Sequence, residues 1–173
     1  MPLHVDIPTH DQVSRLFDTV GETCVSVYLP TDPVSPGQAE RIALKNLVDE
    51  AVSQLEEAGT EKRVVAAVEE QFSDLVEDDF FWRYQARSLA VFATPAWLVT
   101  YRLPNRLTEI VDVADRFHLG PLLRSITFPQ VALVLAISQN SVKLLEVLPE
   151  GGPSEVELGE LPEGVADSVP IAH

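Results

Sequence analysis

The segment 112–118 holds the residues with the greatest potential for chemistry. Asp115, Arg116 and His118 place a carboxylate, a guanidinium and an imidazole in one short run, and Asp112 precedes them. A histidine tuned by a carboxylate can act as a general acid or base, so one hypothesis is a hydrolase centred on His118. In the alternative interpretation Asp115 and Arg116 form a structural ion pair. Because no serine or cysteine nucleophile stands beside His118, we predict no catalytic residue.

A second group of polar residues follows the apolar run 24–29. Thr31 and Asp32 come directly after this run, and Lys45 and Asn46 lie on the helix expected next. Hydroxyl, carboxylate, ammonium and amide groups near the end of a strand would suit a small molecule or a nucleotide. A small-molecule or nucleotide-binding α/β domain is therefore a further hypothesis.

Metal and cofactor chemistry finds no support in the sequence. Cys24 is the single cysteine and lies in an apolar run, where we expect an inert buried thiol. The histidines are far apart, whereas zinc sites need clustered ligands. Gly151 and Gly152 lie between expected strands and do not open a helix, so they do not form a phosphate-binding loop. We predict no metal and no cofactor.

The charge balance limits the classes of partner. The chain has 173 residues with 27 acidic and 12 basic side chains, a formal net charge of -15. Such a field repels phosphate backbones and anionic lipids, so we expect no membrane contact and no direct nucleic-acid binding outside a local basic patch. The first residues lack the pattern of a signal peptide, and the apolar run 131–137 is too short to span a bilayer. We expect a cytoplasmic protein.

Hydrophobic periodicity predicts the helices that would hold these residues. A long amphipathic helix is expected over 38–58, with Glu40 on its polar face, and a second over 64–76. Gly59 ends the first helix and Thr60 is a candidate cap for the second. So short a connection predicts an antiparallel αα-hairpin. Near the N-terminus, Thr9 is the candidate cap of a short helix that Gly21 ends, with Phe17 on its apolar face.

Runs rich in β-branched and aromatic residues predict the strands. They cover 24–29, 88–93, 97–103, 109–114, 130–137, 141–148 and 155–161. Ser138, Gln139 and Asn140 form a polar turn between two of them, and a short helix is expected at 121–125. The pattern predicts an α/β fold in which a mixed β-sheet carries an αα-hairpin layer, followed by additional β-hairpin strands. We expect an N-terminal α/β domain over 1–127 and the first strands of a second, incomplete domain over 128–173.

Several of these segments together resemble a known family. They are residues 25–31, 44–47, 115–119 with 121–123, and 138–144. The resemblance is to the N-terminal part of bacterial proteins related to the eukaryotic and archaeal class-1 peptide-chain release factor, and it spans about residues 23–148. It implies an N-terminal α/β domain followed by the opening strands of a middle domain.

The resemblance also directs the functional expectation. Release factors promote peptidyl-tRNA hydrolysis with a Gly-Gly-Gln loop, which this sequence lacks, so no catalytic residue is carried over. The first hypothesis is therefore a non-catalytic recognition domain of a translation-associated, release-factor-like protein that contacts ribosome, tRNA or a protein partner. The candidate contacts are Thr31, Asp32, Lys45, Asn46, Arg116, His118, Ser138, Gln139 and Asn140. Exposed strand edges within 130–148 would also allow a homodimer.

Overall fold

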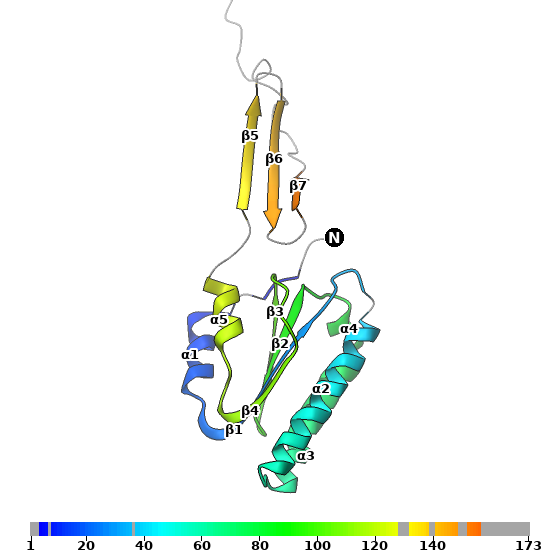
Figure 1. Cartoon of the computed structure of the whole chain (residues 1–173), viewed down its shortest axis with the longest axis vertical. Helices are drawn as coiled ribbons and strands as arrows, with labels where there is room; N and C mark the ends of the chain where they lie inside the picture. The colour runs from blue at the N-terminus through cyan, green and yellow to red at the C-terminus, as the bar shows by residue number, and fades with distance from the viewer. Residues whose placement is uncertain are drawn as a thin grey trace, which may run out of the picture. The chain divides into compact units, whose positions relative to one another are not determined.

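A four-stranded sheet organises the first of two units, which divide between Phe128 and Pro129. The computed structural model describes residues 4–6, 8–35, 37–127, 132–138, 141–148 and 152–156. The elements of the first unit are α1 (His10–Asp18), β1 (Val20–Pro30), α2 (Gln38–Glu57), α3 (Lys62–Glu77), α4 (Asp79–Trp82), β2 (Ser88–Ala93), β3 (Leu98–Leu103), β4 (Ile110–Arg116) and α5 (Gly120–Thr127) (Figure 1).

The strands of this sheet are ordered β3-β2-β1-β4, and each of their pairings is antiparallel. The helical hairpin α2–α3 explains the direction of β2, because two antiparallel helices return the chain to the end at which β1 stopped. A single crossover helix would have delivered a parallel strand. The expected α/β class with its αα-hairpin layer and later hairpin strands is confirmed, and the described pairings add that the sheet is antiparallel.

Strand β1 lies at the centre of the sheet and is buried on both faces. Val25, Val27 and Leu29 belong to the core shared with α2 and α3, whereas Cys24 and Tyr28 belong to the core shared with α1 and α5. All five side chains are fully buried. Figure 1 shows the two helical layers on opposite sides of the sheet. Successive side chains of β1 thus pack alternately into two cores, which explains why its sequence is nearly continuously apolar.

The turn between α2 and α3 closes through the backbone. Gly59 adopts a φ of +74°, its N–H donates to the Glu56 carbonyl, and the Thr60 N–H donates to the Leu55 carbonyl. This is the Schellman arrangement, which favours glycine at this position. The prediction that Thr60 caps α3 is wrong. Its amide closes α2 instead, and the cap position of α3 is Glu61, which makes no side-chain cap hydrogen bond.

The short helix α1 agrees with the sequence at its start and differs at its end. Thr9 forms a capping box with Gln12, as its position predicted. The helix ends at Asp18, however, and Gly21 lies inside β1 with a φ of +82°, where the pairing with β4 shifts register. The prediction for Phe17 is also wrong, because this side chain is 57% exposed.

The second unit is a three-stranded antiparallel sheet. Its strands are β5 (Ala132–Ser138), β6 (Ser141–Leu148) and β7 (Gly152–Val156), in the order β5-β6-β7. The hairpin expected between β5 and β6 is confirmed. The third strand begins earlier than predicted, since Gly152 and Pro153 pair with β6 where a turn was expected. A proline is tolerated there because β7 is an edge strand in the described sheet.

The aromatic run after α3 anchors the helical layer to the sheet. Trp82 is fully buried, and its indole Nε1 donates to the Leu75 carbonyl at 2.9 Å. Gly37, the cap residue of α2, adopts a φ of +83° and packs directly against Trp82. A Cβ atom at Gly37 would lie 2.9 Å from the Trp82 Cβ and 3.2 Å from its carbonyl oxygen. Neither atom can move aside without shifting the backbone.

The contact between Gly37 and Trp82 predicts the outcome of a matched pair of substitutions. Gly59→Ala should cost about 1 kcal/mol of unfolding free energy, because its Cβ meets nothing within 4 Å and only the left-handed backbone is strained. Gly37→Ala should cost about 2–4 kcal/mol, because overpacking against Trp82 adds to the same strain. Urea unfolding followed by tryptophan fluorescence measures both. Equal losses in the two variants would show that the close contact is unimportant.

Candidate functional site

Two polar side chains of β1 hold the segment that begins α5. The Ser26 hydroxyl accepts a hydrogen bond from the His118 backbone N–H at 2.9 Å, and the Tyr28 hydroxyl donates to the His118 carbonyl at 2.6 Å. The Leu122 backbone also hydrogen-bonds the Tyr28 hydroxyl. Both β1 residues are fully buried. We refer to Ser26, Tyr28 and their contacts with residues 118–122 as the Tyr28 clamp.

The side chains of this segment divide between the core and the surface. Phe117 is buried, whereas the His118 side chain is exposed and lies edge-on to the Tyr28 ring, with 6.4 Å between centroids. The Asp115 carboxylate contacts the Arg116 guanidinium at 3.3 Å, and both side chains are about two-thirds exposed. The carboxylate that was considered as a tuner of His118 is therefore paired with Arg116, as in the structural interpretation.

The loop that follows β1 is held by a residue that sequence patterning misassigned. Glu40 was expected on the polar face of α2, but it is only 8% exposed. Its carboxylate accepts hydrogen bonds from the Asp32 N–H at 3.3 Å and the Ser35 hydroxyl at 2.8 Å. The available signal was its place as the third residue of α2, where a glutamate reaches back over the helix start.

Thr31 and Asp32 use their polar groups within this same loop. The Thr31 hydroxyl donates to the Ala86 carbonyl at 2.8 Å, and the Asp32 carboxylate accepts from the Val34 N–H at 2.9 Å. These bonds connect the end of β1 to the start of β2 and form an Asx turn. Both residues therefore have a structural role, and a binding role for them stays a prediction.

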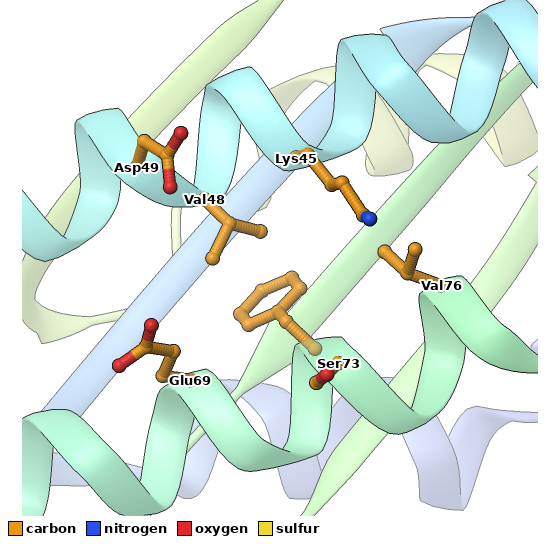
Figure 2. Close-up of a pocket in the computed structure, with 7 residues that line it drawn as sticks. Lys45, Val48, Asp49, Glu69, Ser73 and Val76 are labelled. Atoms are coloured by element: carbon orange, nitrogen blue, oxygen red, sulfur yellow. The ribbon is translucent and has the colours of Figure 1, made fainter.

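One of the predicted binding residues, Lys45, lines a groove between α2 and α3 (Figure 2). Its volume is about 210 Å³. The lining consists of Lys45, Val48, Asp49, Glu69, Phe72, Ser73 and Val76. Figure 2 shows the Lys45 ammonium over one end of the groove and the carboxylates of Asp49 and Glu69 at the other. Asn46 is exposed on the same helix, but neither it nor Thr31 nor Asp32 belongs to this lining.

The remaining predicted contacts lie in or beside the second unit. Ser138 is the last residue of β5 and pairs with Ser141 across the hairpin. Gln139 and Asn140 fall outside the described residues. Within the part of the chain that the structure describes, no three His, Cys, Asp or Glu side chains are grouped as ligands for a metal ion. A search of the helices in that same part finds none with the length and apolarity to cross a membrane.

Comparison with known proteins finds one family whose description matches part of the chain. Residues 129–172 match the family described as Bacterial archaeo-eukaryotic release factor family 11. The predicted release-factor resemblance is confirmed over this segment. The matched range includes 138–144, one of the segments that carried the resemblance, whereas the segment 115–119 precedes it. No curated protein sequence matches the chain.

The chain also resembles a solved structure described as "Archaeal protein". The TM-score is 0.47 at 12% sequence identity, and the alignment covers 89% of this chain and 45% of the other. The chain thus spans less than half the length of that protein. A likeness at this level carries no functional argument.

The Tyr28 clamp predicts the effect of removing one hydroxyl. Tyr28→Phe leaves the His118 carbonyl and the Leu122 N–H without their buried partner, which should cost about 1–3 kcal/mol of unfolding free energy. Tyr84→Phe, on the exposed surface, should change the free energy by less than about 0.5 kcal/mol. Chemical denaturation measures both variants, and amide hydrogen exchange at Leu122 should accelerate in Tyr28→Phe alone. Unchanged exchange there would contradict the clamp.

The same burial predicts a dependence of stability on alkaline pH. Burial raises the pKa of Tyr28 well above its usual value, against a smaller lowering by the Leu122 N–H. Below about pH 10 the Tyr28 hydroxyl keeps its proton in both the folded and the unfolded chain, so the clamp makes its full contribution to the free energy of unfolding. Above about pH 10 Tyr28 ionises first in the unfolded chain, and the free energy of unfolding falls as the pH rises.

Denaturation between about pH 8 and pH 11 tests this dependence. The free energy of unfolding should fall more steeply with pH in the wild-type chain than in Tyr28→Phe. Burial also raises the pKa of Tyr101, so a shallower fall should remain in the variant. Identical slopes in the two proteins would rule out Tyr28 as the responsible group.

Proposed function

We propose that this chain is a non-catalytic recognition module of a translation-associated, release-factor-like protein, contacting ribosome, tRNA or a protein partner. The match of residues 129–172 to a release-factor family carries the proposal, because that family points to translation. The arrangement of the first unit supports it. The buried hydroxyls of Ser26 and Tyr28 are used to hold residues 118–122, and Arg116 and His118 are left on the surface above them.

The alternative small-molecule site has one observation in its favour, the groove that Lys45 lines. Its volume of about 210 Å³ lies below the roughly 300–1,000 Å³ of ordinary ligand pockets. Its buried floor includes Phe72, and its two ends carry opposite charges. A groove of this size suits a single side chain of a partner protein better than a nucleotide.

The hydrolase centred on His118 is a weaker alternative. A hydrolytic histidine needs a nucleophile or a positioned water and an orienting group. The Asp115 carboxylate is engaged with Arg116, and the Ser26 hydroxyl is engaged with the His118 backbone. Surface recognition needs only exposed polar groups, which the His118 imidazole and the Asp115–Arg116 pair provide, so we favour it.

Cosedimentation with ribosomes tests the proposed function. The intact chain should sediment with ribosomes through a sucrose cushion, with enrichment when translation is stalled. The double substitution Arg116→Gln and His118→Ala should reduce the bound fraction several-fold, because both side chains are exposed while the clamp uses only the His118 backbone. Arg63→Gln, an exposed arginine on α3, is the control. Absence of the wild-type chain from the ribosomal pellet would argue strongly against the proposal.

A further inference from the structure

The groove between α2 and α3 has an apolar floor that the core of the first unit holds in place. Its volume of about 210 Å³ is below the range of pockets that enclose whole small molecules. Val48, Phe72 and Val76 form the floor, and each of them is at most 8% exposed. All three belong to the buried cluster that α2 and α3 share with one face of the sheet. The floor is therefore preformed in the free chain.

The rim of the groove separates charge by sign. Figure 2 shows the Lys45 ammonium over one end and the Asp49 and Glu69 carboxylates at the other. All three side chains are exposed, and in the part of the chain that the structure describes none of them forms an ion pair or a hydrogen bond. Lys45 and Asp49 stand about one helical turn apart, but the lysine precedes the acid, which is the less favourable order for such a pair. The charges of the rim are therefore available to a partner.

Two carboxylates share one end of the groove, and neither is neutralised by another side chain within the described residues. Asp49 comes from α2 and Glu69 from α3, so the helical hairpin brings two like charges to the same place. The surroundings add to this repulsion, since residues 38–77 contain ten acidic and four basic side chains. A cation at this end is attracted by both carboxylates and by the negative field of the helical layer.

We propose that this groove receives an arginine side chain of a partner protein. The methylene groups of the arginine pack on Val48 and Phe72, as long cationic side chains do on apolar surface. The guanidinium lies between the carboxylates of Asp49 and Glu69, because a planar group with five N–H donors can bond two carboxylates at once. The Lys45 ammonium repels a guanidinium from the opposite end and so sets the direction in which the side chain lies.

Other occupants use only part of this arrangement. An apolar side chain would cover the floor, but it would displace water from the Asp49 and Glu69 carboxylates without replacing the lost hydrogen bonds. A lysine would bring the charge as a compact point, without a planar fork that spans two carboxylates. Anionic ligands are repelled at this end. The inference goes beyond the proposed function in translation, because Arg116 and His118 are not among the lining residues.

A capped pentapeptide with a central arginine between alanine and glycine residues tests the inference on the intact chain. The peptide is added to the isotope-labelled chain, and NMR follows the backbone amides. Amides within 45–49 and 69–76 should shift with a Kd on the order of 1 mM, because exposed ion pairs contribute little. Citrulline in place of the arginine keeps the shape without the charge and should weaken binding at least about fivefold. Norleucine keeps only the methylene groups and should weaken binding at least about as much.

A matched pair of double variants separates the groove from general loss of negative charge. Asp49→Asn with Glu69→Gln should weaken binding of the arginine peptide at least about fivefold. Glu50→Gln with Glu70→Gln removes two exposed carboxylates that are adjacent in sequence but outside the lining. This control should change the Kd by less than about twofold at physiological salt, where distant charges are screened. Circular dichroism confirms that both variants are folded.

Three results would each overturn the inference. The first is a wild-type chain whose groove amides do not respond to the arginine peptide. The second is equal binding of the citrulline or the norleucine peptide, which would show that the groove takes a neutral side chain. The third is an equal loss of affinity in the two double variants, which would show that the peptide responds only to the overall charge of the helical layer.

Cosedimentation separates this inference from the proposed function. If the chain cosediments with ribosomes while the arginine peptide leaves the groove amides unchanged, the inference fails and the proposed function stands. If the arginine peptide binds as expected while the chain is absent from the ribosomal pellet, the inference stands and the proposed function fails.

Discussion

The burial of β1 on both faces is the constraint on which the first unit depends. This strand pairs with β2 on one side and β4 on the other, and its side chains enter two separate cores. Each backbone group must therefore find its partner in the sheet, and each side chain must match the layer that it faces. The α2–α3 hairpin satisfies this constraint because it covers one face and returns the chain beside β1.

The same constraint explains why residues 118–122 lie where they do. Ser26 and Tyr28 are polar groups inside a strand that water cannot reach, and a buried hydroxyl without a partner costs about 1–3 kcal/mol. The backbone of His118 and Leu122 supplies those partners. The position of the exposed His118 is thus fixed by hydrogen bonds between its main chain and the buried hydroxyls of Ser26 and Tyr28, and these bonds do not involve its ring.

The sequence predicted those features that depend on local periodicity and missed those that depend on tertiary contacts. Both long helices and the β2–β3 hairpin follow from residue spacing, which neighbouring residues alone decide. Thr60 was misassigned because α3 begins at Lys62, which makes Glu61 the cap position. Glu40 was misassigned because a loop folds over it. Among the candidate contacts, Lys45 and Asn46 are adjacent in sequence, but only Lys45 faces the groove, since packing sets side-chain direction.

A net charge describes the whole chain, whereas the fold can place acidic and basic side chains in different parts of the molecule. The acidic balance predicts repulsion of nucleic acid, and that holds for the α2–α3 layer, where acidic side chains predominate. Residues 80–127, by contrast, contain six arginines against three acidic side chains. With a Debye length of about 8–10 Å, a ligand responds mainly to the charges near the place where it binds.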